Sequence, residues 1–280
     1  MNEKKIDIEV HAYRSKKQQS DTLEGVKNIY TLSEIETDYD IAFVTNPTSL
    51  HYGTLMNIKN KAKWFFVEKP LFERVYSLEN TASADNYYVA APLRYKQVMN
   101  AAKNIIDTNN VLHARAICSS YLPDWRKEDY RESYSANEDM GGGIELDCIH
   151  ELDYVIHLFG LPLQSFSMIG KVSNLEISSN DTANYMLKYE NMYAEVHVDY
   201  FGKAKQRKLE IITEEETFEI DFYNNSITSL LSGEVFQYNE ESNSMYLNEM
   251  EYFLKDVMEE KSNHNNLVHA LEVLKIAKGD

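Results

Sequence analysis

The chain has 280 residues and a formal net charge of −17, because it carries 45 acidic but only 28 basic side chains. That charge disfavours nonspecific binding to nucleic acid or to an anionic membrane, so we expect neither as a partner. Hydrophobic residues make up 43% of the sequence, which is enough to bury a core and excludes a wholly disordered chain.

The two cysteines, Cys118 and Cys148, form no CxxC pair and no disulfide framework, which favours a reducing compartment. The N-terminus lacks the apolar core of a signal peptide, and no apolar run is long enough to span a membrane. We therefore expect a cytoplasmic protein.

The first third of the chain alternates between strand-like and helix-like segments. Residues 6–13 alternate polar and apolar side chains, and residues 40–45 form a short apolar run that stops at Asn46-Pro47. Such alternation predicts a parallel α/β sheet. The expected strands cover residues 6–13, 40–45, 63–67 and 87–91, and the expected helices cover 49–59 and 77–84.

The pattern changes near Pro92, after which strand-like segments with short connections predict an open, mainly antiparallel sheet. We therefore divide the chain into an α/β domain over residues 1–92 and an α+β open-sheet domain over residues 93–280. In the second domain we expect strands over 111–120, 164–172, 183–189, 193–201, 208–213 and 217–222, and helices over 95–106, 144–159, 245–259 and 264–278.

Two turns that could carry chemistry follow strands of the predicted parallel sheet. Thr45, Asn46 and Pro47, with His51 soon after, lie at the carboxyl end of a strand, where open α/β sheets bind ligands. A capped turn is the alternative interpretation. Glu68-Lys69-Pro70 follows the next strand, and Lys69 at that edge can donate to a substrate hydroxyl; an ordinary surface turn is again the alternative.

A third signal is the run of three glycines at 141–143 that opens the helix expected over 144–159. Asp147, His150 and Asp153 follow at spacings of three, so we expect them on one helix face. A histidine with a carboxylate one turn away can act as a general base with a defined tautomer, although a capped helix is the plainer alternative. His157 is a further candidate metal ligand, but its flanks are apolar, so we expect no metal.

In this order and at this spacing, these signals and Arg94-Tyr95 resemble the glucose–fructose oxidoreductase / inositol dehydrogenase (Gfo/Idh/MocA) family, from about Ile6 to the end of the chain. The resemblance implies an incomplete, truncated Rossmann-type NAD(P)-binding domain over residues 1–92 and an open-sheet substrate and oligomerisation domain over residues 93–280. It also implies oxidation or reduction of a hydroxyl on a sugar, cyclitol or nucleotide-sugar, with a homo-oligomer formed through the open sheet.

The resemblance implies that Lys69 and His150 are the catalytic pair and that Asp147 is their helper. His150 would take the hydroxyl proton while Lys69 hydrogen-bonds the reacting oxygen. The family usually has three residues between this aspartate and histidine, whereas this chain has two. The residues expected at the cofactor are Arg14, Ser15, Thr45, Asn46, Pro47, His51, Glu68 and Lys69, and those expected at the substrate are Arg94, Tyr121, Trp125, Arg126 and Asp153.

Aromatic rings and arginines such as Trp125 and Arg126 suit a sugar ring and an anionic group, although a subunit contact would use the same residues. Arg14 and Ser15, followed by two lysines, end the predicted second strand of the Rossmann unit. Basic residues at that position suit a ribose 2′-phosphate, so we expect NADP in preference to NAD; a solvated basic turn is the alternative.

The Gly-x-Gly-x-x-Gly loop with which the family opens has no counterpart in this sequence, since no glycine precedes Gly25. That loop and its helix form the pyrophosphate site, so we expect a chain that begins at Met1 to bind dinucleotide poorly. A late recorded start, a degraded gene copy and a non-redox role remain open explanations. The alternative function is a noncatalytic binding or oligomer subunit derived from this family.

Overall fold

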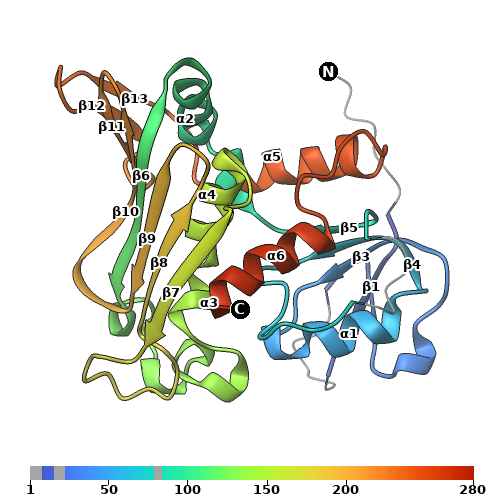
Figure 1. The fold of residues 1–280 in the computed structure, drawn as a ribbon. Coiled ribbons are helices and arrows are strands. Elements are labelled where there is room, and N and C mark those ends of the chain that lie inside the picture. The colour runs from blue at the N-terminus through green and yellow to red at the C-terminus, as the bar shows by residue number, and fades with distance from the viewer. Residues whose placement is uncertain (1–7, 16–22, 79–83) are drawn as a thin grey trace.

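The computed structural model of the chain describes residues 8–15, 23–78 and 84–280. A large eight-stranded sheet and two small parallel sheets lie side by side, with helices between them (Figure 1). None of the described helices is long and apolar enough to cross a bilayer.

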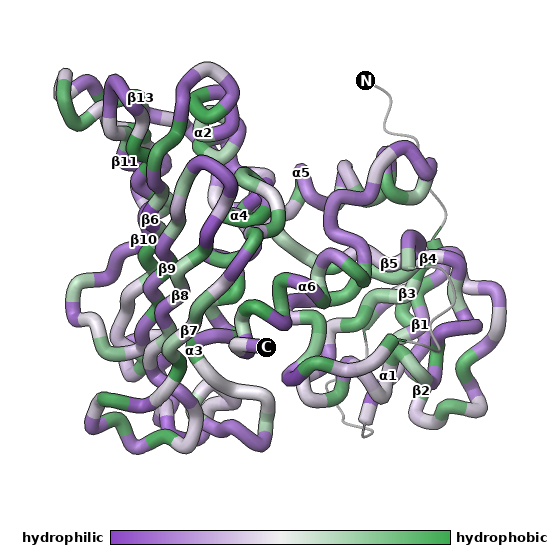
Figure 2. Tube along the Cα trace, in the orientation of Figure 1, coloured by the Kyte–Doolittle hydropathy of each residue, from purple (hydrophilic) through white to green (hydrophobic). Residues whose placement is uncertain are grey.

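The large sheet has the strand order β13-β12-β11-β10-β6-β9-β8-β7 and is antiparallel except where β6 and β9 run in parallel. This confirms the predicted open, mainly antiparallel sheet. Figure 2 shows hydrophobic and hydrophilic residues alternating along its strands, as expected for a sheet with only one covered face. The strands are β6 (Val111–Tyr121), β7 (Gln164–Gly170), β8 (Thr182–Lys188), β9 (Tyr193–Asp199), β10 (Phe201–Thr213), β11 (Thr217–Asp221), β12 (Ser226–Ser229) and β13 (Val235–Gln237).

The N-terminal part forms two small parallel sheets instead of one. β1 (Val10–Tyr13) pairs with β2 (Val26–Ile29), while β3 (Tyr39–Val44), β4 (Ala62–Val67) and β5 (Tyr87–Val89) form the second sheet. Within the described ranges no backbone ladder joins β1 to β3, although His11 Nδ1 lies 2.5 Å from the Tyr39 hydroxyl. The parallel pairing was predicted; the division into two sheets is set by which strand edges meet.

Helices fill the space between the sheets and bury the main core. α4 (Ile149–Phe159) packs on β6 and β9, α3 (Ile144–Asp147) packs on β8 and β9, and α6 (Leu267–Lys278) contacts both β7 and β5. The remaining helices are α1 (His51–Ile58), α2 (Gln97–Thr108) and α5 (Ser244–Tyr252), the last continued by a π-helical turn over Phe253–Val257. Thus α6 connects the two parts of the molecule (Figure 1).

The helix expected over residues 144–159 is broken at Cys148, whose φ of −102° and ψ of 31° separate α3 from α4. Asp147 and His150 therefore lie on opposite sides of the break and not on one continuous helix face. The prediction was wrong here because spacing does not reveal a local turn that tertiary contacts impose. The helix expected over residues 77–84 falls largely outside the described residues.

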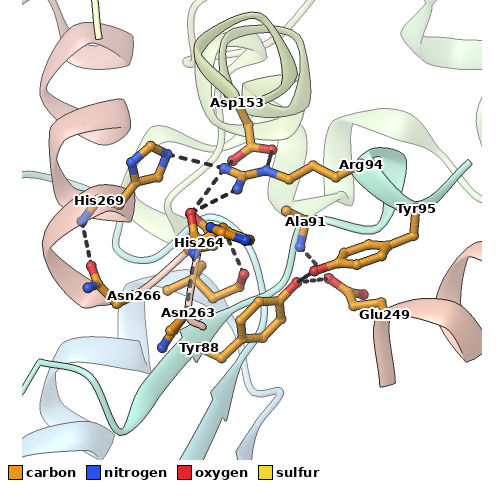
Figure 3. A network of polar contacts seen from close by, with 12 residues as sticks. Tyr88, Ala91, Arg94, Tyr95, Asp153, Glu249, Asn263, His264, Asn266 and His269 are labelled. Carbon is orange, nitrogen blue, oxygen red and sulfur yellow. Dashed lines mark hydrogen bonds and ion pairs between the residues drawn. The ribbon is translucent and has the colours of Figure 1, made fainter. Parts of the chain in front are cut away.

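α5 is attached to the parallel sheet by a buried carboxylate (Figure 3). Glu249 Oε1 accepts hydrogen bonds from the Tyr88 hydroxyl at 3.0 Å and from the Ala91 backbone N–H at 2.5 Å. Tyr88 in turn lies 3.0 Å from the Tyr95 hydroxyl. Burial raises the pKa of Glu249 from 4.5 to about 7, and the hydrogen bonds from Ala91 and Tyr88 oppose this shift only in part.

Because the folded state holds this proton more tightly than the unfolded state, Glu249 stabilises the fold below about pH 4.5 and loses that contribution as pH rises to about 7. Glu249→Gln keeps an acceptor without the charge, so we expect it to increase the free energy of unfolding above pH 7 by up to about 3 kcal/mol. Urea denaturation at pH 5 and pH 8 measures this. Glu251→Gln, on the exposed side of α5, is the matched control; an equal response of both variants would contradict the assignment.

Candidate active site

The two predicted turns and the glycine-led segment meet at the carboxyl edge of β3 and β4. Lys69 follows the end of β4, and its Nζ donates a hydrogen bond of 2.8 Å to the backbone carbonyl of Asp147, at the end of α3. The Lys69–Pro70 peptide bond is cis. The structure therefore brings together residues 78 positions apart, one from each part of the chain.

A small cavity of about 20 Å³ lies at this junction, lined on its polar side by Lys69, His150, Asp153 and Asn265. A space of this size holds roughly one water-sized group. Both Lys69 and His150 line this cavity. The lining is otherwise apolar, with Leu71, Val89 and Ile149 among its residues.

His150 lies in the first turn of α4, on the cavity wall. Burial lowers the pKa of its imidazole well below the usual value, and the nearby charges of Lys69 and Arg207 act in the same direction. The ring is therefore neutral near pH 7, which is the form that accepts a proton. Among the described residues, none forms a hydrogen bond with this ring.

Asp147 is buried and contacts tyrosines, not the His150 ring. The Tyr200 hydroxyl donates to Asp147 Oδ2 at 2.5 Å. Burial and the neighbouring Asp147 raise the pKa of Tyr134 to about 12. Sequence reasoning missed both tyrosines, because neither belongs to a motif; Tyr200 lies between β9 and β10, which gives no chemical signal of its own.

The glycine run is required for close packing of backbone against backbone. Gly141 and Gly143 have φ values of 82° and 138°, which disfavour any residue with a side chain. A Cβ on Gly142 would lie 2.1 Å from the Tyr134 carbonyl oxygen, and one on Gly141 would lie 3.3 Å from the Ser49 backbone nitrogen. Because the glycines have no side chain, this loop can lie in close contact with the turn that follows β3.

His51 is a buried link between two turns. Its Nε2 lies 2.8 Å from the Asn46 carbonyl oxygen, and its Nδ1 lies 3.1 Å from the carbonyl oxygens of Pro70 and Leu71. The Asn46 side chain donates to Thr54 Oγ1 at 2.8 Å. His51 therefore positions the loops after β3 and β4, whereas the buried Oδ1 of Asn46 has no hydrogen-bond partner among the described residues.

Arg94 and Asp153, both expected at the substrate, pair with each other inside the protein (Figure 3). Arg94 Nε and Nη2 donate to the two carboxylate oxygens of Asp153 at 2.8 and 2.6 Å, and Nη1 donates to the His264 carbonyl at 3.0 Å. Arg94 is 5% exposed. Asp153 therefore lines the cavity, but its carboxylate already forms an ion pair with Arg94.

Tyr121, Trp125 and Arg126 lie beside the tyrosines that surround Asp147. Trp125 packs edge-on against Tyr200 with ring centroids 5.3 Å apart, and Arg126 lies over the Tyr134 ring, 5.3 Å from its centroid. A further cation, missed from the sequence, completes the group: Lys203 Nζ sits 2.8 Å from the Tyr121 ring centroid. No carboxylate within the described ranges pairs with Arg126 or Lys203.

The remaining residues that were predicted to contact the cofactor are spread along the strand ends. Glu68 is exposed, and its backbone N–H donates to the Val44 carbonyl at 2.9 Å. Arg14 directly follows β1 and donates from Nε to Asn28 Oδ1 at 3.2 Å, while Ser15 is exposed. The two lysines that follow them in the sequence lie outside the described residues. Neither Arg14 nor Ser15 lines the Lys69–His150 cavity.

Within the described residues, one group of metal-ligating atoms is close enough to hold an ion: Cys118, Cys148 and Glu151. His157 is not part of it. Burial lowers the pKa of His157 to about 4.

Residues 99–219 match the family model of the GFO/IDH/MocA C-terminal domain. Over these residues the chain is similar to the C-terminal domain of the Gfo/Idh/MocA family. This match confirms the resemblance that the motifs predicted. A comparison with curated protein sequences gives no match.

Solved structures share the fold over most of the chain. A levoglucosan dehydrogenase in complex with NADH and levoglucosan aligns with a TM-score of 0.76 and 14% identity, over 90% of this chain and 80% of that one. The myo-inositol 2-dehydrogenase of Lactobacillus plantarum gives 0.73 and 20%, over 96% and 87%. The UDP-N-acetylglucosamine 3-dehydrogenase GnnA of Acidithiobacillus ferrooxidans gives 0.66 and 16%, over 88% and 78%. These likenesses show the two-part fold.

Proposed function

We propose that this chain is an NAD(P)-dependent oxidoreductase that acts on a hydroxyl of a sugar, cyclitol or nucleotide-sugar. The observation that carries the proposal is the single cavity that Lys69 and His150 share across the junction of the two parts. The family match and the sugar dehydrogenases that share the fold support the same reaction class.

The chemistry of each side chain follows from its surroundings. Neutral His150 accepts the hydroxyl proton, and the Lys69 ammonium donates a hydrogen bond to the oxygen as negative charge develops on it. The bond from Lys69 to the Asp147 carbonyl fixes the ammonium in place, with Asp147 held by Tyr200. A bound nicotinamide dinucleotide would supply the hydride acceptor.

Lys69→Met and His150→Asn remove these two roles without adding charge. We expect each to lower kcat/KM by roughly 10²- to 10⁴-fold in a sugar-dependent NAD(P) reduction assay. In the unmodified chain, kcat/KM should begin to decrease only below pH 6.5, where His150 becomes protonated. The reason is that the pKa of His150 in the free enzyme lies well below its usual value.

Lys63→Met is the matched control, since Lys63 is exposed and pairs with Asp40 on the surface. Thermal unfolding of all variants separates loss of chemistry from loss of fold. Full activity in folded Lys69→Met or His150→Asn would overturn the assigned roles.

The fit of this chain to a dinucleotide is partial. The turns after β3 and β4 stand at the edge where such folds bind ligands, whereas the printed sequence holds no Gly-x-Gly-x-x-Gly loop for the pyrophosphate. We propose that Thr45, Asn46 and Lys69 flank the nicotinamide end, and that Arg14 and Ser15 prefer the 2′-phosphate of NADP.

A titration of NADPH and NADH into the chain, followed by protein fluorescence, tests this preference. Trp64 on β4 provides a reporter near the expected site. We expect tighter binding of NADPH, and Arg14→Asp should reverse the order, because a carboxylate repels the 2′-phosphate and accepts a ribose hydroxyl. A folded chain that binds neither dinucleotide would instead favour the noncatalytic binding or oligomer subunit.

The substrate proposal rests on Arg126 and Lys203, two cations over aromatic rings with no acidic partner among the described residues. Together with Tyr121 and Trp125, they suit a sugar that carries an anionic group. Arg126→Gln should raise KM for such a substrate at least tenfold and leave KM for an uncharged cyclitol unchanged. Arg131→Gln is the control, because Arg131 is already paired with Asp129 and Glu176. Equal effects on both substrates would contradict the proposal.

We also propose that the uncovered face of the large sheet joins copies of the chain into a homo-oligomer. Phe166 on β7 is 66% exposed and Met168 is 74% exposed, and both lie on this face with Met186. Large exposed apolar side chains on one face are typical of protein interfaces. Sedimentation as a 32.5 kDa monomer at micromolar concentration would count against it.

A further inference from the structure

Two cysteines from distant parts of the sequence meet behind the proposed catalytic helix. Cys118 lies on β6, and Cys148 occupies the break between α3 and α4. Their Sγ atoms are 3.5 Å apart, and the residues are only 2% and 4% exposed. A disulfide has an S–S distance of about 2.05 Å, so the sulfurs need to approach by only about 1.5 Å.

The charges around the pair favour redox chemistry over metal binding. Cys118, Cys148 and Glu151 present three ligand atoms within 4.8 Å of one another. Glu151, however, is fully buried and already pairs with the Arg207 guanidinium, whose Nε lies 2.8 Å from Oε1. A metal ion bound by Glu151 would face that guanidinium in a site of low dielectric constant, whereas a disulfide adds no charge.

We propose that Cys118 and Cys148 form a redox-sensitive pair that a hydroperoxide converts into an intramolecular disulfide. One sulfur attacks the peroxide oxygen as a thiolate, which gives a sulfenic acid and releases water or an alcohol. The other sulfur then displaces the hydroxyl group of the sulfenic acid, so the S–S bond forms and water leaves. In sum, two thiols are oxidised, one peroxide is reduced, and a dithiol reductant reverses the change.

The position of Cys148 connects this step to the active site. Asp147, immediately before it, offers the backbone carbonyl that accepts the hydrogen bond from Lys69, and His150 follows two residues later. A disulfide would tie this short segment to β6 and displace both groups from the geometry described above. Oxidation is therefore expected to suppress turnover reversibly, a consequence that rests on the proposed function.

Burial makes the pair slow to react. The hydrogen bond with Cys118 and burial raise the pKa of the Cys148 thiol well above its ordinary value, while Arg207 opposes this shift. The reactive thiolate is therefore scarce at neutral pH. We expect the rate of disulfide formation to increase with pH between 7 and 9.

The test uses the whole chain under native conditions, with hydrogen peroxide as the oxidant. Free thiols are then counted in denaturant, and peptides are mapped before and after reduction. We expect the two thiols of each chain to disappear together, a mass loss of two hydrogens, and one cross-linked peptide pair containing Cys118 and Cys148. Dithiothreitol should restore both thiols.

Cys118→Ser and Cys148→Ser are the control variants, and neither can form the internal bond. The peptide map of the unmodified chain decides the question even if a variant fails to fold. Persistence of both thiols in the native chain, while the unfolded chain oxidises, would overturn the proposal, as would cross-links only between chains.

These readouts do not depend on catalysis. A chain without sugar dehydrogenase activity would contradict the proposed function and leave the disulfide to be judged by the peptide map. An active chain whose thiols resist peroxide would contradict only the redox proposal.

Discussion

The buried pair of Arg94 and Asp153 is the interaction on which the arrangement of this molecule depends. Arg94 follows β5, Asp153 lies on α4, and the same guanidinium contacts the His264 carbonyl just before α6. One cation therefore joins the parallel sheet, α4 and the C-terminal helix. Removal of either partner would leave an uncompensated charge in the core, at a cost of roughly 3–5 kcal/mol. The pair therefore has a structural role, whereas the sequence led us to expect both residues at the substrate.

This connection explains how residues from two parts of the chain form one site. β4 carries Lys69 to its carboxyl edge, α4 carries His150, and the Arg94–Asp153 pair fixes the distance between the two elements. The Lys69–Asp147 hydrogen bond then aligns them locally. Asn265 reinforces the junction, because its backbone and side chain both bond to Val89 at the edge of β5. Several independent contacts thus determine the same geometry.

In the parallel sheets, the sequence pattern predicts individual strands but not how the strands pair. Segments 40–45 and 63–67 were recognised because short apolar runs bounded by turns are typical of buried parallel strands. Val26–Ile29 was missed because its side chains alternate too weakly over four residues. Whether β1 would pair with β3 could not be predicted, since pairing depends on which edges meet in three dimensions. Solved dehydrogenase structures share this fold over most of the chain.

The sequence by itself determined the two-part architecture, the family resemblance, and the positions of Lys69, Asp147 and His150, because motif order and hydrophobic period are local properties. Only the tertiary structure decided the contacts of these groups. In the folded chain, Asp147 accepts a hydrogen bond from Tyr200 and Arg94 pairs with Asp153. His51 contacts the backbone of two loops and so joins them. The tertiary structure also brought Cys118 within 3.5 Å of Cys148, although thirty residues separate them. Each of these contacts depends on burial, which gives a polar group few alternatives to the partner that the fold provides.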